Sequence, residues 1–167
     1  MSYYIPDYRA KSIFEIDYDK LRKLGIKGIL IDIDNTLVPM HTRIPTEEAI
    51  NWVKEMIHLD FKVCILSNAN HERTSLFKDI LAVTGVGMAF KPRKKGYLKA
   101  LEVLALENTQ CVMIGDQLLT DIKGGNKINM MTVLTEVLDK NEHWFVRLKR
   151  VIENLFLRKQ LEKVEWI

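Results

Sequence analysis

An apolar run that ends in two carboxylates constrains this chain more than any other feature of its sequence. The run from Gly28 to Ile31 predicts a buried strand, and Asp32 and Asp34 follow it closely. Two buried carboxylates are costly unless a cation or hydrogen bonds offset their charge. We therefore predict that the strand ends there and delivers both acids to a cleft at its carboxyl end, the edge where open parallel sheets bind ligands.

Strands and helices are expected to alternate along most of the chain. Four further apolar runs predict strands, and segments with apolar residues at helical spacing separate them. Such alternation is typical of an α/β domain in which right-handed crossovers place helices on a parallel sheet. We predict a three-layer α/β sandwich with a mainly parallel, five-stranded sheet. Its strands would span residues 28–31, 61–66, 86–90, 111–114 and 131–134.

Length and composition fit one globular domain. A chain of 167 residues, 47% hydrophobic and 28% charged, can bury a single core. Cys64 and Cys111 lie in apolar runs, which predicts reduced, buried thiols and a cytoplasmic protein. We expect no signal peptide and no membrane span, because no apolar stretch of sufficient length occurs. The net charge of +3 is compatible with an anionic substrate but does not establish one.

Both ends of the expected single domain, residues 1–167, carry distinctive segments. Residues 1–24 are rich in aromatic and aliphatic side chains, so we predict that they pack on the domain. Residues 141–167 predict a long amphipathic helix with one apolar and one basic side. Two interpretations of this helix stay open. Either its apolar side packs on the domain, or the helix lies on an anionic membrane, at the inner face, as a peripheral contact.

Asp32 and Asp34 have the spacing of a pair that acts on one substrate. Positions two apart on a strand share a face, and this constraint loosens where the strand becomes a loop. One carboxylate can attack phosphorus, while a second protonates the leaving alcohol and later accepts a proton from water. Thr36 adds a hydroxyl that can contact the substrate. An isolated pair of this kind would be interpreted as a turn at the end of a strand. The polar residues at the ends of the other strands favour a catalytic pair instead.

Two more predicted strands end in residues suited to phosphate. Ser67 and Asn68 supply a hydroxyl and an amide that can hydrogen-bond phosphate oxygens, although such a pair is also common at a helix N-cap. Lys91 precedes Pro92, which restricts the local backbone. A lysine fixed in this way can hold charge on a transferring phosphoryl group. Considered alone, Lys91 would be interpreted as a surface lysine.

Asp116 is expected to share a metal ion with Asp32. It follows a predicted strand and Gly115, so it reaches the same edge of the sheet. A few carboxylates, water and a substrate phosphate form the oxygen site that suits Mg²⁺. Asp121 either supports these ligands from behind or caps the next helix, and the cap is slightly favoured. The four histidines are scattered and show no metal-ligand spacing.

In this order and at these strand ends, the residues resemble the four motifs of the haloacid dehalogenase (HAD) phosphatases. The resemblance implies a HAD-like Rossmannoid fold, with Asp32 as nucleophile and Asp34 as general acid/base. It further implies that Asp32, the backbone carbonyl of Asp34 and Asp116 bind Mg²⁺. Ser67 and Lys91 would hold the phosphoryl group. The matching stretches are residues 32–36, 67–68, 91–92 and 115–121.

A closer resemblance is to the YqeG-type phosphatases of HAD subfamily IIIA, and it covers nearly the whole chain. It rests on residues 5–8, 11–16, 34–38 and 115–121. These bacterial proteins are similar to mitochondrial phosphatidylglycerophosphate phosphatases, which implies a role in phosphatidylglycerol synthesis. The chain departs from its relatives at residues 127–130, where a glycine is usual, so we expect an altered loop before the last strand.

The short gaps between motifs leave no room for a cap domain, so we expect an open site. An open site suits a bulky phosphomonoester, such as a lipid head group or a macromolecule. Phosphatidylglycerophosphate is the leading candidate. A phosphatase acting on phosphoprotein or nucleic-acid ends is an alternative, as is a regulatory binding protein with little activity. We expect no nucleic-acid partner, because no stacking platform or nucleic-acid motif occurs. The oligomeric state is left undetermined.

Overall fold

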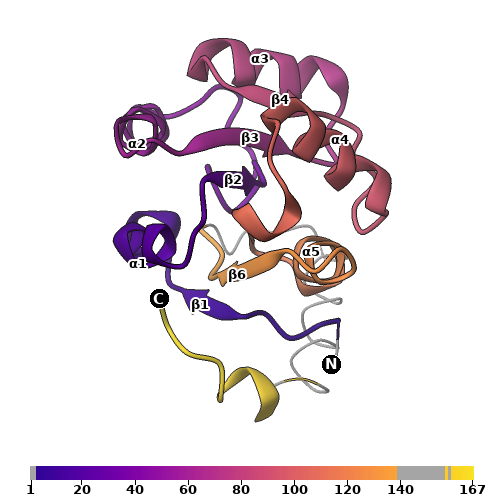
Figure 1. The fold of residues 1–167 in the computed structure, drawn as a ribbon. Helices are drawn as coiled ribbons and strands as arrows, with labels where there is room; N and C mark the ends of the chain where they lie inside the picture. The colour runs from indigo at the N-terminus through magenta and orange to yellow at the C-terminus, as the bar shows by residue number, and fades with distance from the viewer. Residues whose placement is uncertain (1–2, 139–156, 158) are drawn as a thin grey trace.

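Among the residues that the structure describes, the sheet has six strands rather than the five predicted. The computed structural model describes residues 3–138, 157 and 159–167. Within these residues the strands follow the order β1-β6-β5-β2-β3-β4, and every neighbouring pair is parallel (Figure 1). The strands are β1 (Tyr8–Ala10), β2 (Gly28–Ile31), β3 (Lys62–Leu66), β4 (Thr84–Val86), β5 (Cys111–Gly115) and β6 (Met131–Thr135).

The extra strand is β1, which the sequence pattern does not reveal. It has three residues and no apolar run, and it forms by pairing with β6, with Tyr8 opposite Val133. The third expected strand also differs, because β4 ends at Val86 instead of continuing to residue 90. Met88 and Phe90 have positive φ angles of 47° and 53°, which a strand does not accommodate.

The helices follow the predicted order, and two predicted N-caps are confirmed. Asp17 accepts a hydrogen bond from Lys20 N–H at the start of α1, and Thr46 accepts one from Ala49 N–H at the start of α2. The α-helices are α1 (Tyr18–Lys23), α2 (Glu47–His58), α3 (His71–Leu81), α4 (Lys94–Leu104) and α5 (Lys123–Asn126). Shorter elements are the 3₁₀-helices η1 (Ile13–Glu15) and η2 (Asn108–Gln110) and the π-helix η3 (Leu118–Ile122).

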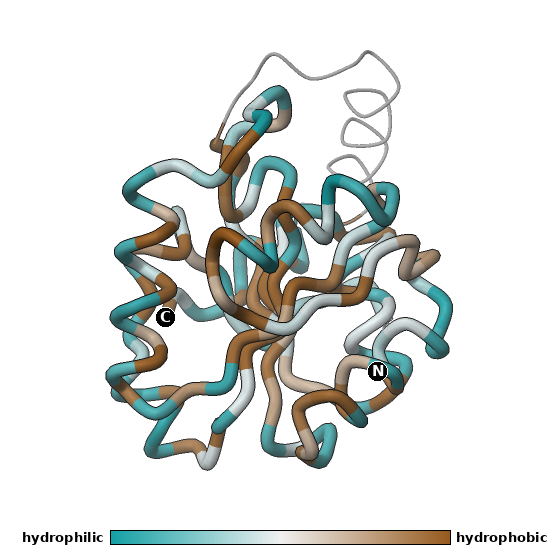
Figure 2. Tube along the Cα trace, turned by 90° about the horizontal axis from the view of Figure 1, so that it is seen from above, coloured by the Kyte–Doolittle hydropathy of each residue, from teal (hydrophilic) through white to brown (hydrophobic). Residues whose placement is uncertain are grey.

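The sheet separates two apolar cores. Ile29 and Ile31 of β2 face the core that α1, α2 and α3 cover, while Leu30 between them faces the core that α4 covers. In Figure 1, α1 and α2 lie on one side of the sheet and α4 and α5 on the other. Figure 2 shows the central strands as hydrophobic and the peripheral turns as largely hydrophilic. The predicted three-layer α/β class is therefore confirmed, since both faces of the parallel sheet are covered.

Both cysteines are buried free thiols, as predicted. Cys64 on β3 and Cys111 on β5 lie in the core beneath α4. Burial raises the pKa of Cys64 to about 11 and the pKa of Cys111 to about 12. Because the thiolate is the reactive form, neither side chain is suited to nucleophilic chemistry near neutral pH.

The C-terminal residues lie along the free edge of β1. Arg9 N–H donates to the carbonyl of Glu165, and Ile167 N–H donates to the carbonyl of Arg9, each at 2.9 Å. The described helical residues end at Leu161, whereas the sequence predicted a helix to Ile167. Leu161 packs against η3. Most of the expected helix, residues 141–156 and 158, lies outside the described residues. In the part of the chain that is described, no helix is long and apolar enough to span a membrane.

Candidate active site

Three neighbouring strands bring their polar ends together at one edge of the sheet. β2 lies in register between β3 and β5, so the residues that follow the three strands are neighbours in space. Asp32 follows β2, Ser67 follows β3 and Asp116 follows β5, and all three are buried. The structure thus gathers the residues that the sequence placed at strand ends.

A buried lysine lies between two carboxylates at this edge. Lys91 Nζ is 2.8 Å from Asp32 Oδ1 and 2.7 Å from Asp121 Oδ1. Both contacts are ion pairs between the ammonium and a carboxylate. Burial by itself lowers the pKa of Lys91, but the charges of Asp121 and Asp32 outweigh it and raise that pKa above its usual value. Lys91 therefore remains a cation between the two carboxylates.

Asn68 and Ser67 have different contacts in this site. The side-chain amide of Asn68 makes two hydrogen bonds to the backbone of Lys91. Asn68 Oδ1 accepts from Lys91 N–H at 2.7 Å, and Asn68 Nδ2 donates to the Lys91 carbonyl at 3.3 Å. Ser67 Oγ accepts from Ala69 N–H at 3.1 Å, which leaves its own O–H as a donor. Asn68 thus positions the lysine, and Ser67 is the member of the pair that can donate to a phosphate oxygen.

Asp121 lies inside η3, so the interpretation of this residue as a helix N-cap is wrong. Its Oδ2 accepts a hydrogen bond from Gln117 N–H at 3.1 Å, and its other oxygen pairs with Lys91. Burial raises the pKa of Asp121, although Lys91 opposes the shift. Gly115 provides the space for this carboxylate, because a Cβ at Gly115 would collide with it.

The segment that carries Asp121 is anchored to α4. The Tyr97 hydroxyl lies 3.0 Å from the Thr120 carbonyl and 3.2 Å from the Asp121 carbonyl, so it can donate to either. Gly124 lies directly against the Tyr97 ring, and Gly125 lies against β6. Gly124 thus permits close packing against α4 and Gly125 close packing against the sheet, which offsets the unfavourable propensity of glycine for a helix.

Three carboxylates at this edge could hold a divalent cation. Asp32, Asp116 and Asp121 each offer one oxygen, these oxygens lie within 4.8 Å of one another, and all three residues are buried. Thr36, expected to contact substrate, donates its hydroxyl to Asp116 Oδ1 at 3.2 Å. The carboxylate of Asp34 is not in this cluster.

Arg73 is a site residue that the sequence analysis missed. Arg73 Nη2 lies 2.8 Å from Asp34 Oδ1, and both side chains are partly buried. Burial raises the pKa of Asp34, and the charge of Arg73 limits that rise. Arg73 belongs to the first turn of α3, where its N–H donates to the capping Asn70. Its position soon after Ser67 was the available signal, but the sequence could not distinguish it from an ordinary surface arginine.

We expect the substitution Arg73→Gln to move the alkaline limb of the pH–activity profile to higher pH. Loss of the guanidinium removes the charge that holds down the pKa of Asp34, so its acid form persists to higher pH. The measurement is kcat/KM against pH for a soluble phosphomonoester. Arg22→Gln is the matched control, since Arg22 pairs with the exposed Asp19 on α1. If the alkaline limb of the pH–activity profile stays in place in Arg73→Gln, Arg73 does not control the pKa of Asp34.

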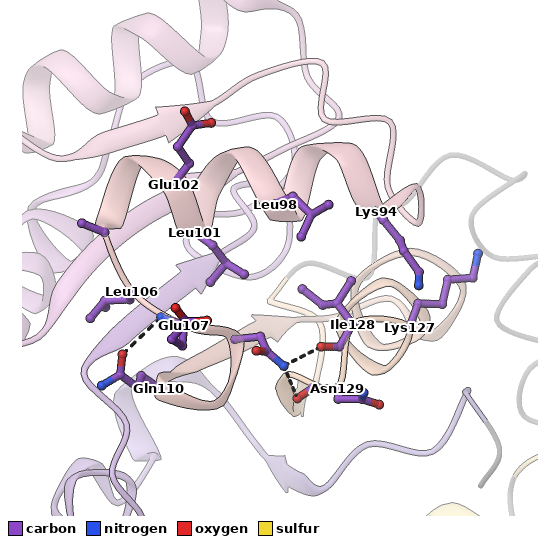
Figure 3. Close-up of a pocket in the computed structure, with 12 residues that line it drawn as sticks. Lys94, Leu98, Leu101, Glu102, Leu106, Glu107, Gln110, Lys127, Ile128 and Asn129 are labelled. Atoms are coloured by element: carbon purple, nitrogen blue, oxygen red, sulfur yellow. Dashed lines mark hydrogen bonds between the residues drawn. The ribbon is translucent and has the colours of Figure 1, made fainter.

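A cavity of about 720 Å³ lies apart from these acids, between α4 and the loop before β6 (Figure 3). Asn108 Nδ2 donates to the carbonyls of Ile128 and Asn129 and so closes one side of it. Asn129 has a φ of 54°, a left-handed conformation that glycine adopts easily and asparagine tolerates. The loop at residues 127–130 therefore keeps a backbone conformation typical of glycine, although it contains none.

The chain belongs to the HAD-like hydrolases. The HAD-hydrolase-like family matches residues 89–147, which include Lys91, Asp116 and Asp121. Over 166 residues the chain is 36% identical to "Probable phosphatase YqeG" of Bacillus subtilis, covering 98% of this chain and 96% of that protein. Within its class, the chain is thus a member of the YqeG-type phosphatase family, and the resemblance noted in the sequence is confirmed.

A second relative and two solved structures extend this comparison. The chain is 29% identical over 178 residues to Phosphatidylglycerophosphate phosphatase 1, chloroplastic/mitochondrial, of Arabidopsis thaliana, covering 96% of this chain and 50% of that protein. The cobalt-bound deoxy-D-mannose-octulosonate 8-phosphate phosphatase of Haemophilus influenzae aligns with a TM-score of 0.53 at 16% identity, covering 84% of this chain and 91% of that one. An uncharacterized protein from Listeria monocytogenes aligns with a TM-score of 0.55 at 18% identity, covering 80% and 99%. At these identities the two structures support the fold.

Proposed function

We propose that this protein is a Mg²⁺-dependent phosphomonoester phosphatase that works through an aspartyl-phosphate intermediate. The observation that carries the proposal is the meeting of Asp32, Lys91 and Asp116 at one edge of the sheet. Asp32 is 2.8 Å from the buried ammonium of Lys91 and shares a cluster of carboxylate oxygens with Asp116. A nucleophile, a fixed cation and hard oxygen ligands are the groups that phosphoryl transfer requires.

The carboxylates of this cluster fit a divalent cation. Three buried carboxylates meet one buried ammonium, so the cluster retains negative charge after pairing with Lys91. Its donors are hard oxygens, which Mg²⁺ prefers. Both oxygens of Asp121 are engaged, one by Lys91 and the other by Gln117 N–H. We therefore assign Asp32, Asp116 and the backbone carbonyl of Asp34 as the ligands, with Asp121 as support behind them. When bound, the metal would neutralise charge on the phosphoryl oxygens.

The protein side chains account for the proton and bond changes of the proposed reaction. A carboxylate oxygen of Asp32 forms a bond to phosphorus as the bond from phosphorus to the ester oxygen breaks, and Asp34 protonates the departing alcohol. Water then attacks the phosphorus, Asp34 accepts a proton from it, and the Asp32 carboxylate is released. A carboxyl whose pKa burial has raised suits the acid step. Ser67 and Lys91 hold the phosphoryl oxygens.

We infer that the substrate is a lipid phosphomonoester of the phosphatidylglycerophosphate type. The named activity of the Arabidopsis thaliana relative supports this choice. The described structure also supports it, because α2 is the helix between β2 and β3, and α3 and β4 are the elements between β3 and Lys91. Neither stretch forms a cap domain, so the site admits a substrate whose alcohol portion is large.

Phosphate release is the experiment that tests this function. We would compare phosphatidylglycerophosphate in mixed micelles with soluble phosphomonoesters, each with Mg²⁺ and with a chelator. We expect turnover to require Mg²⁺ and kcat/KM to favour the lipid by at least roughly tenfold, since binding of the remote part of the substrate can lower the barrier. Turnover of soluble esters alone would keep the chemistry and remove the lipid assignment, and full turnover without metal would contradict the proposed site.

A further inference from the structure

Two large apolar side chains are exposed on the loop that leads into Lys91. Met88 is 42% exposed and Phe90 is 56% exposed. Both residues have a left-handed backbone, with φ angles of 47° and 53°. Bulky residues rarely adopt this conformation, and backbone outliers of this kind concentrate at functional sites. The Met88–Phe90 loop therefore warrants a functional explanation.

This loop is fixed to the active-site segment that follows β3. Met88 N–H donates to the carbonyl of Ala69 at 2.8 Å, and Ala89 N–H donates to the carbonyl of Ser67 at 3.0 Å. Ala89 itself is buried. These backbone hydrogen bonds thus hold the loop that exposes Met88 and Phe90 against the segment that contains Ser67.

Two cavities flank the Met88–Phe90 loop. One has a volume of about 380 Å³ and is bordered by Met88 and Phe90 together with the site residues Asn68 and Lys91. The other has a volume of about 350 Å³ and lies between the same loop and α4. Met88 and Phe90 therefore share a cavity with two residues of the candidate site, Asn68 and Lys91.

The surroundings of the loop are basic. Arg93, Lys95 and Lys99 border the second cavity, and the Arg93 guanidinium lies 5.8 Å from the centre of the Phe90 ring. Among the described residues that border either cavity, none is acidic. The sequence itself has no acidic residue between Asp79 and Glu102. Exposed apolar side chains that are surrounded by basic residues match a partner that is apolar inside and anionic at its surface.

We propose that Met88, Phe90, Arg93 and Lys95 form a docking surface for an anionic phospholipid bilayer. The inference rests on the proposed function, and it assigns membrane contact to this loop rather than to the basic C-terminal segment. Met88 and Phe90 enter the boundary between head groups and acyl chains, while Arg93 and Lys95 pair with lipid phosphates. Because this surface borders Lys91, a phosphorylated head group reaches the site while its acyl chains stay in the membrane.

Vesicle flotation tests the proposal with the full-length protein. The vesicles are phosphatidylcholine alone or phosphatidylcholine with 30% phosphatidylglycerol, a composition chosen to make the surface anionic. We expect the wild type to float with the anionic vesicles. We expect the double substitution Met88→Ser and Phe90→Ser to lower that partitioning by at least about tenfold, because two apolar side chains no longer insert. Arg93→Gln with Lys95→Gln should lower it severalfold and weaken its dependence on salt.

A matched control replaces two apolar side chains of similar exposure elsewhere, Leu24→Ser at the C-cap of α1 and Ile57→Ser on α2. These variants should float like the wild type. Thermal unfolding identifies any variant that fails to fold, and single substitutions then replace the pair. Anionic vesicles that fail to bind the wild type, or that bind the Met88 and Phe90 variants equally well, would overturn the proposal. Vesicle binding by a protein that does not hydrolyse phosphatidylglycerophosphate would support the docking surface and contradict the lipid substrate instead.

Discussion

Replacing Asp32 by asparagine is expected to abolish turnover while leaving the fold intact. The amide cannot serve as the carboxylate nucleophile, so we expect kcat to fall by at least roughly 1,000-fold. Asparagine has the same shape, and its side-chain oxygen can still accept the hydrogen bond that Ile33 N–H donates at 2.9 Å. Lys91 also keeps its contact with Asp121 at 2.7 Å. The measurement is phosphate release at saturating substrate beside thermal unfolding of the same preparation.

The matched control for this experiment is Asp79→Asn, because Asp79 lies on α3 with a side chain that is 70% exposed. We expect that variant to keep the activity and the stability of the wild type. Mass spectrometry of acid-quenched wild-type reactions should in addition find a phosphoryl group on Asp32, which the Asp32→Asn protein lacks. Near-normal turnover in Asp32→Asn would remove Asp32 as the nucleophile.

Replacing Lys91 by methionine is expected to cost both stability and activity. The substitution leaves Asp32 and Asp121 buried without the ammonium that lies between them. Removal of one partner from a buried ion pair typically costs about 3–5 kcal/mol of unfolding free energy. We would measure urea unfolding in the presence of a chelator, so that metal binding does not contribute to the result. Lys78→Met is the control, since Lys78 pairs with the exposed Asp79 and should change stability by less than about 1 kcal/mol.

A double substitution separates the structural role of Lys91 from its chemical one. Lys91→Met combined with Asp121→Asn removes the cation and one of the carboxylates that depend on it, so it should recover part of the lost stability. It should not recover turnover, because the phosphoryl group would still lack its fixed cation. A single Lys91→Met protein as stable as the wild type would contradict the view that Lys91 compensates the buried acids.

The strand ends of the site were predictable because their chemistry conflicts with their surroundings. Asp32 and Asp116 directly follow apolar strands, where a carboxylate is costly unless a ligand needs it. Arg73 was not predictable, because it lies on a helix in a polar stretch and its partner Asp34 is 39 residues away in the sequence. The contact of Asp121 with Lys91 was not predictable either. It depends on the position of Asp121 within η3, which the sequence pattern does not reveal.

The fold shows the same contrast. The central strands are buried on both faces, so each must be apolar along its whole length. Such continuous apolar runs can be recognised in the sequence. β1 has the sequence Tyr-Arg-Ala, and pairing with β6 rather than any local preference makes it a strand. The left-handed residues Met88 and Phe90 likewise depend on hydrogen bonds to a distant segment, and no propensity of methionine or phenylalanine predicts them.

The outer strands of the sheet bear on how this molecule behaves at high concentration. β1 and β4 are each three residues long, and residues 165–167 lie along the outer side of β1. Long open strands recruit strands from other molecules through their unpaired backbone groups, a route to aggregation. Here one outer strand is covered and the other is short, so copies of the chain find little backbone on which to add a strand. The apolar central strands can therefore be strongly β-forming without making the folded protein prone to self-association through its sheet.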